Sequence, residues 1–69
     1  MEVFQERLLA LRKGANLKQE ELAEELQISY RSYRRYEAGQ TEPTLPVLIR
    51  MADYFQVSID YLAGRSEKR

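Results

Sequence analysis

One segment, residues 19–39 (QEELAEELQISYRSYRRYEAG), limits the possible folds of this chain more than any other. Apolar residues recur in its first part at the spacing of a short amphipathic helix, at Leu22, Ala23 and Leu26. Ser29 is a preferred N-cap residue, and Gly39 suits the position just after a helix end. The segment therefore predicts two short helices, over about 19–26 and 30–38, with a tight turn between them.

The second of these helices is predicted to be basic on its outer side. Its residues divide between two sides of the helical wheel, with Tyr33 and Tyr36 on one and Arg31, Arg34 and Arg35 on the other. We expect the two tyrosines to belong to the core. Two short helices joined by a tight turn fit a DNA major groove, and arginine binds both guanine edges and phosphate. The pattern therefore favours a surface that binds nucleic acid.

The charges of the chain balance overall but are unevenly distributed. There are 11 basic and 11 acidic residues, whereas proteins that bind nucleic acid are usually basic. Residues 30–36 contain three arginines and no acid, and residues 20–25 contain four glutamates and no base. Only the patch that faces the nucleic acid sets counterion release, so this polarity is compatible with binding. The glutamates are interpreted as a solvated helix face.

Length and composition exclude several other classes of protein. The 69 residues allow one domain, and the absence of Cys and His excludes thiolate and imidazole metal sites, so no metal or cofactor is expected. The same absence, together with the lack of a Gly-rich phosphate loop, argues against an enzyme. No apolar run approaches the roughly 20 residues that span a membrane, and the N-terminus lacks a signal-peptide cleavage site. We therefore expect a soluble cytoplasmic protein.

Three more helices are predicted, which gives an all-α fold of five short helices. A first helix is expected over about 3–13, a fourth from Thr44 as cap to residue 54 or 55, and a fifth over about 59–63 after Ser58. The apolar stripe of the fourth helix is predicted to contain Leu45, Leu48, Ile49, Ala52 and Phe55. Residues 1–64 are expected to form the domain, and residues 65–69 (RSEKR) a frayed, charged tail.

The order and spacing of several motifs resemble the Cro/CI-type (XRE family) helix-turn-helix domain of lambdoid phage repressors. The motifs are Leu11-Arg12, residues 19–23 (QEELA), Ile28-Ser29, residues 36–39 (YEAG), Pro43-Thr44-Leu45 and residues 57–62 (VSIDYL). The resemblance covers nearly the whole chain and implies a compact lambda-repressor-like domain. Its helix-turn-helix would be formed by the second and third helices.

The resemblance also implies roles for individual residues. Tyr30, Arg31 and Arg35 match positions that contact DNA bases. The positions expected to contact phosphate are Gln19, Ser32, Arg34, Gln40 and Thr41, and Arg34 is also a candidate for a base contact. Lys18, where the family commonly has Thr or Ser, is expected to be an additional phosphate contact. Arg12 and Glu37 match a structural salt bridge. Where the family often has glycine this chain has Gln27, which predicts a left-handed backbone there, and bulky Tyr33 stands where a smaller residue is common.

The predicted function is a sequence-specific regulator of transcription that binds double-stranded DNA. A single small domain has a small footprint, so we expect a homodimer on a palindromic operator, acting as a repressor in a bacterial cytoplasm or nucleoid. The dimer surface is expected around residues 56–61, with Tyr54 and Tyr61 as candidates that are expected to be exposed. The alternative is an antitoxin or other protein-interaction module with the same fold. The chain could also be a fragment of a larger regulator.

Overall fold

The computed structural model describes residues 2–69 and contains five helices in that part of the chain. These are α1 (Glu2–Gly14), α2 (Gln19–Glu25), α3 (Tyr30–Glu37), α4 (Leu45–Phe55) and α5 (Ile59–Leu62). No strand occurs within residues 2–69. The all-α prediction is confirmed, and each helix end lies within about one residue of its expected position.

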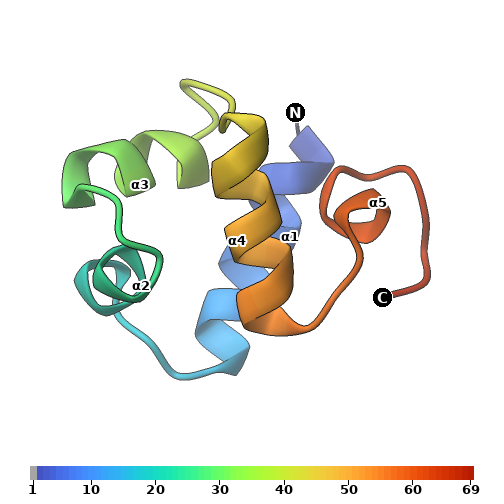
Figure 1. Cartoon of the computed structure of the whole chain (residues 1–69), viewed down its shortest axis with the longest axis horizontal. Helices are drawn as coiled ribbons and strands as arrows, with labels where there is room; N and C mark the ends of the chain where they lie inside the picture. The colour runs from blue at the N-terminus through green and yellow to red at the C-terminus, as the bar shows by residue number, and fades with distance from the viewer. Residues whose placement is uncertain (1) are drawn as a thin grey trace.

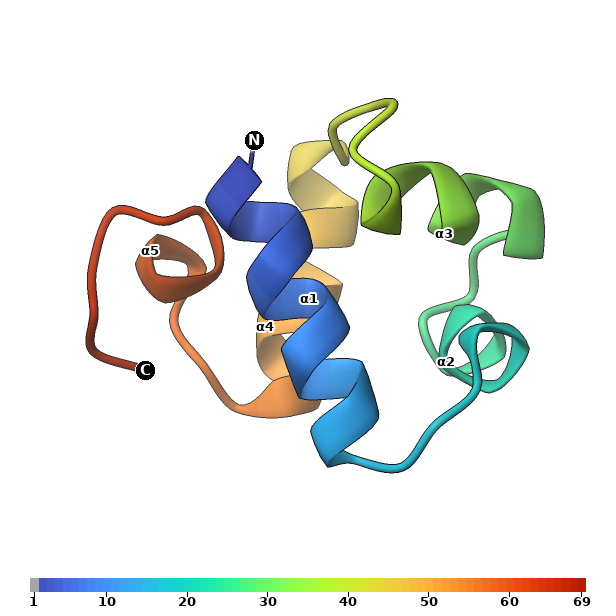
Figure 2. The same cartoon turned by 180° about the vertical axis from the view of Figure 1, so that it is seen from behind.

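The helices are arranged around a central pair. Figures 1 and 2 show α1 and α4 in the middle of the molecule, α2 and α3 on one side of them, and α5 with the C-terminal segment on the other. The molecule measures 27 × 23 × 19 Å. The helix-turn-helix therefore forms one end of the molecule, and α5 forms the opposite end.

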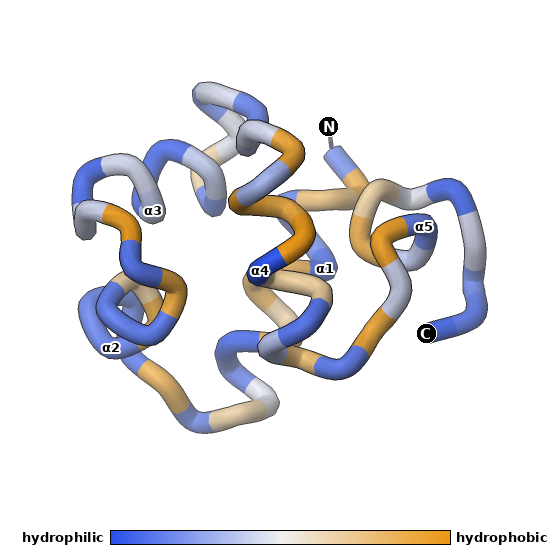
Figure 3. Tube along the Cα trace, in the orientation of Figure 1, coloured by the Kyte–Doolittle hydropathy of each residue, from blue (hydrophilic) through white to orange (hydrophobic). Residues whose placement is uncertain are grey.

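One continuous core joins all five helices. Its fully buried side chains come from α1, from the α2–α3 unit, from α4 and from α5, and the largest are Phe4, Leu8, Leu22, Leu26, Tyr33, Met51 and Leu62. Tyr33 is fully buried, as expected, and Tyr36 is half-buried against the same cluster. Figure 3 shows that α4 carries a long apolar stretch, whereas α3 is hydrophilic over most of its length.

Local signals in the sequence explain where the helices begin and turn. The side chains of Ser29, Thr44 and Ser58 accept hydrogen bonds from backbone N–H groups three residues later, at the starts of α3, α4 and α5. In the turn between α2 and α3, Gln27 has a φ of 59°. This is the left-handed conformation that the resemblance implies at that position.

The buried face of α4 differs from the predicted stripe. Val47, Leu48, Met51 and Ala52 are buried, whereas Leu45 is 62% exposed and Ile49 is 39% exposed. The prediction for Leu45 and Ile49 was therefore wrong. In a helix that is apolar on more than one side, periodicity does not identify which side meets the rest of the core.

The C-terminal tail was expected to be frayed, but the structure places it against α1 and α5. Arg7 on α1 donates hydrogen bonds to the backbone carbonyls of Tyr61 and Ser66 and forms an ion pair with Glu67 at 3.3 Å. The Arg7 side chain is only 15% exposed, so its donors need protein acceptors, and the tail supplies them. No helix within residues 2–69 is long and apolar enough to cross a membrane.

Candidate nucleic-acid interface

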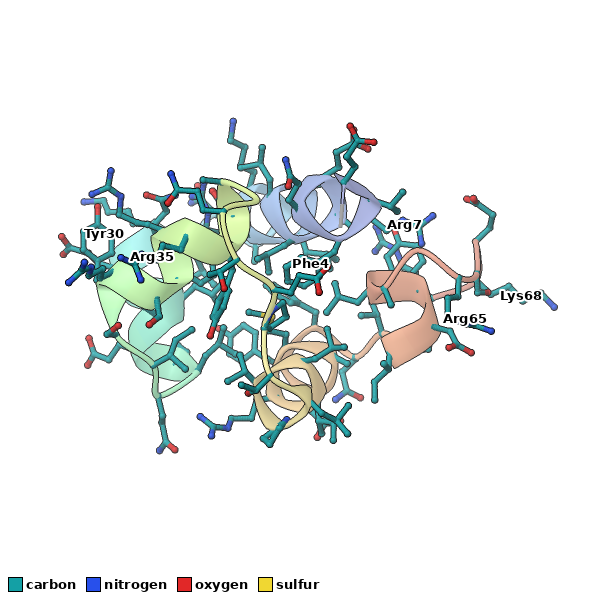
Figure 4. The ribbon with its side chains drawn as sticks, turned by 90° about the horizontal axis from the view of Figure 1, so that it is seen from above. Phe4, Arg7, Tyr30, Arg35, Arg65 and Lys68 are labelled. Atoms are coloured by element: carbon teal, nitrogen blue, oxygen red, sulfur yellow. The ribbon has the colours of Figure 1, made fainter. Side chains whose placement is uncertain are left out.

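The exposed side of α3 carries the predicted base-contacting residues. Tyr30 is the first residue of the helix and is 42% exposed, and Arg31, Arg34 and Arg35 are exposed along the next two turns. Figure 4 shows Tyr30 and Arg35 at one end of the molecule, far from Arg65 and Lys68 at the other. Side chains near the N-terminus of such a helix enter a major groove first.

These three arginines differ from those that stabilise the fold. Arg12 is paired with Glu37, Arg7 donates to tail carbonyls, and Arg50 donates to the carbonyl of Leu26 at 2.8 Å. By contrast, no guanidinium of α3 has a hydrogen bond or ion pair within residues 2–69. The donors on α3 are therefore available to an external acceptor such as a base edge or a phosphate.

A hollow of about 530 Å³ lies between α1, the start of α2 and the outer side of α3. It brings together six of the nine residues predicted to contact DNA, namely Gln19, Tyr30, Arg31, Arg34, Arg35 and Gln40. Lys18 lines a different hollow, beside Arg12 and Lys13 at the α1–α2 loop. Ser32 and Thr41 line neither hollow.

The structure gives Ser32 a role within the chain. Its backbone N–H donates to the Ser29 hydroxyl oxygen at 3.0 Å, and the two hydroxyl groups are hydrogen-bonded at 2.9 Å. Ser32 is half-buried and belongs to the cap of α3. Thr41 is exposed in the loop after α3.

The first turn of α2 is stabilised by the side chains of Glu21 and Gln19, because the N-cap residue provides no side-chain acceptor. Lys18 occupies the cap position but has no acceptor atom, and its backbone N–H donates to the Glu21 carboxylate at 2.8 Å. The next residue, Gln19, donates from Nε2 to Glu37 on α3 at 3.0 Å. The side chain of Gln19 therefore links the first turn of α2 to the end of α3.

Glu37 is the centre of a hydrogen-bond network that joins α1, α2 and α3. Its carboxylate accepts from Arg12 Nε at 2.8 Å and from Arg12 Nη2 at 2.9 Å, which is the bidentate geometry that favours an Arg–carboxylate pair. It also accepts from Gln19 and from the Tyr33 hydroxyl. Arg12 Nη1 donates to the carbonyl of Leu17, so the loop before α2 is tied to the same network.

The network shifts the pKa values of its members. Burial alone would raise the pKa of Glu37, but hydrogen bonds from Arg12, Tyr33 and Gln19 outweigh it and lower the pKa. Burial, and then the hydrogen bond to Glu37, raise the pKa of Tyr33. The hydrogen bond to Glu37 raises the pKa of Arg12. The ionised pair is therefore stabilised, and its side chains are only 13% and 8% exposed.

Sequence reasoning missed two contributors to this end of the molecule. It assigned Tyr33 to the core but not to the Glu37 network, although Tyr33 and Glu37 are four residues apart and share a helix face. It gave no role to Arg50 on α4, whose side chain donates to the carbonyl of Leu26, the C-cap residue of α2. The Arg50 contact spans 24 residues and leaves no local signal in the sequence.

The predicted dimer surface is only partly open. Tyr54 is 39% exposed, but Tyr61 is half-buried, with the Arg7 guanidinium 4.0 Å from the centre of its ring. Ser58 is bonded to the tail through its backbone N–H and its hydroxyl group. The expectation that Tyr61 is exposed was therefore wrong, because Arg7 and the tail cover it.

Comparison with known proteins agrees with this architecture. A helix-turn-helix family model matches residues 8–62. The transcriptional repressor RstR of the cryptic phage CTXphi of Vibrio cholerae is 44% identical over 62 residues, which are 90% of this chain and 55% of RstR. The transcriptional activator BcrR of Enterococcus faecalis is 39% identical over 64 residues, which are 93% of this chain and 31% of BcrR.

A solved structure shows the same fold. The crystal structure of a transcriptional regulator from Listeria innocua superposes with a TM-score of 0.85 at 39% identity, covering 96% of this chain and 62% of that one. The chain therefore belongs to the helix-turn-helix family, and the predicted Cro/CI-type resemblance is confirmed. This chain spans about half the length of RstR and of YobD, a helix-turn-helix transcriptional regulator of Bacillus subtilis that it also resembles.

Proposed function

We propose that this domain binds double-stranded DNA in a sequence-specific manner and regulates transcription. The observation that carries the proposal is the set of three arginines on the exposed side of α3 without an acceptor inside residues 2–69. They project from the second helix of a helix-turn-helix, which is the helix that enters the major groove. Arg31 and Arg35 are assigned to bases, and Gln19 and Gln40 to phosphates on either side of the same hollow.

The proposed mode of action is repression by a homodimer bound to a palindromic operator, in the cytoplasm of a bacterium. RstR is named a repressor, which supports the direction of regulation. A dimer is supported by size, because one domain of 27 Å length covers only one half-site, and half-sites lie about 34 Å apart. Within the expected dimer surface, the exposed part lies at the end of α4, where Tyr54 is accessible.

Selection from a pool of random duplexes at about 150 mM salt tests the proposal, since phosphate contacts alone lose most of their affinity there. We expect an enriched inverted repeat with at least one G·C pair in each half-site, opposite Arg31 or Arg35. The double variant with Arg31→Gln and Arg35→Gln should no longer enrich this repeat, whereas Arg65→Gln, at the opposite end, should still enrich it. Binding without any enriched sequence would refute sequence-specific recognition.

The second candidate is a protein-interaction module, such as an antitoxin. The observation in its favour is the apolar side of α4 that remains uncovered, where Leu45 and Ile49 lie one turn apart and are 62% and 39% exposed. If this candidate is right, Leu45→Ser with Ile49→Ser should abolish binding to a partner protein and leave DNA selection unchanged. If the double variant instead loses only self-association, the exposed residues belong to the dimer.

A further inference from the structure

Tyr30 and Arg34, one turn apart on α3, form a cation–π pair. The central guanidinium carbon of Arg34 lies 5.5 Å from the centre of the Tyr30 ring. Side chains on a helix lean toward its N-terminus, so the side chain at position i+4 covers the turn that carries position i. Such cation–π contacts contribute about 0.5–1 kcal/mol at exposed sites, enough to favour one arrangement of the two side chains.

The contact with the ring leaves the hydrogen-bonding groups of the guanidinium available. A cation–π contact uses the positive charge of Arg34 and none of its N–H donors. No acceptor within residues 2–69 engages these donors. The contact restricts the Arg34 side chain before DNA arrives, which lowers the entropy cost of forming a bidentate contact.

The separation within the pair matches neighbouring bases better than distant ones. Successive bases on one strand are about 3.4 Å apart along the helix axis, so two groups 5.5 Å apart lie within the span of two base-pair steps. In the major groove an arginine fork selects guanine, and an apolar ring packs against the thymine methyl group. Arg31 and Arg35 have no comparable aromatic partner within residues 2–69.

We propose that Tyr30 and Arg34 act as one recognition unit that reads a thymine next to a guanine. Arg34 donates to the guanine and is also the positioning residue for the Tyr30 ring. The inference rests on the proposed function, and it assigns Arg34, for which the sequence allowed a base or a phosphate contact, to base readout. It also makes the base preferences of the two residues interdependent, although they lie on different base pairs.

The experiment uses single-atom changes in the operator that the protein itself selects. Replacing the thymine by uracil removes only the methyl group, and the unmodified protein should lose about three- to fivefold in affinity. Replacing the guanine by 7-deazaguanine removes only the N7 acceptor, and should cost about tenfold. Arg34→Gln should abolish both losses, and Tyr30→Ala should abolish the uracil loss.

Two further variants separate the unit from a phosphate contact. Arg34→Lys keeps the positive charge but not the planar fork, and a lysine can still reach guanine N7 and the tyrosine ring, so we expect it to show both losses in reduced size. Arg65→Gln should retain both losses. The inference is overturned if Arg34→Gln retains the uracil loss, or if it weakens binding to all operators equally and lowers the salt dependence by about one phosphate.

The unmodified protein distinguishes this inference from the proposed function. If it selects no sequence at all, the proposed function fails. If it selects an operator whose affinity is insensitive to both base modifications, DNA recognition stands and the Tyr30–Arg34 unit is refuted.

Discussion

The two ends of this molecule use arginine in opposite ways. At the α5 end, Arg7 is nearly buried, contacts two backbone carbonyls and lies over the Tyr61 ring. At the α3 end, Arg31 and Arg35 are exposed and have no acceptor within residues 2–69. The same residue type stabilises the fold at one end and remains available for a ligand at the other, so composition alone does not identify an interface.

The largest expected effect comes from removing the centre of the network that holds the α3 end in place. Glu37→Gln should lower the free energy of unfolding by about 3–5 kcal/mol, because it strands a buried guanidinium at Arg12. Thermal and urea denaturation would measure the loss. Glu67→Gln, which removes the 96% exposed partner of Arg7 at the other end, is the control and should cost under about 1 kcal/mol. Equal losses in the two variants would show that the Glu37 network contributes no more to stability than an exposed ion pair does.

A matched pair of substitutions tests the comparison of the arginines directly. Arg7→Gln should reduce stability by about 1–3 kcal/mol and leave DNA affinity per folded molecule unchanged, since the carbonyls of Tyr61 and Ser66 lose their donor. Arg35→Gln should leave the melting temperature unchanged and reduce affinity for the selected operator by about tenfold or more. The contrast between the two arginines would be contradicted if Arg35→Gln unfolded the domain, or if it reduced the affinity for all DNA sequences equally.

Tyr33→Phe should lower the free energy of unfolding by about 1 kcal/mol. This is less than the loss expected for Glu37→Gln, because Glu37 keeps its donors from Arg12 and Gln19. Urea denaturation would measure the change. Tyr54→Phe at an exposed position is the control and should have no effect. An unchanged free energy of unfolding in Tyr33→Phe would show that Tyr33 contributes through core packing alone, as the sequence predicted.

The pKa of Glu37 predicts a dependence of stability on pH. The carboxyl has a lower pKa in the folded state than in the unfolded chain, so its contribution is complete above the unfolded value, near 4.5. That contribution decreases as the pH falls through the lower, folded pKa. The stability difference between the unmodified protein and Glu37→Gln should therefore narrow on acidification below pH 4.5, and urea titrations across that range would measure it. A constant difference would contradict the assignment.

The smallest expected effect concerns the turn that separates α2 from α3. Gln27→Gly removes a side chain from a backbone with φ of 59°, and should raise stability by about 0.5 kcal/mol or leave it unchanged. Glu24→Gly in the last turn of α2 is the matched control and should cost about 0.5–1 kcal/mol. A clear loss in Gln27→Gly would show that the Gln27 side chain contributes to the turn in a way that its backbone conformation does not reveal.

Most of the fold was predictable because its signals are local. The caps at Ser29, Thr44 and Ser58 act over three residues, and the resemblance to the helix-turn-helix family implied the left-handed turn at Gln27. The sequence therefore determined the helices, their approximate ends and the family. It also placed the arginines of α3 on one side of their helix, because helical periodicity alone decides that.

Tertiary structure decided which chemical groups remain available. Arg7 and Arg35 are both arginines on amphipathic helices, and only the packing of the tail against α1 engages one of them and not the other. The uncovered side of α4 and the Tyr33 hydroxyl bond depend in the same way on what lies opposite each helix. Such contacts join residues far apart in the chain or on different elements, so periodicity and capping, which act within about four residues, do not specify them.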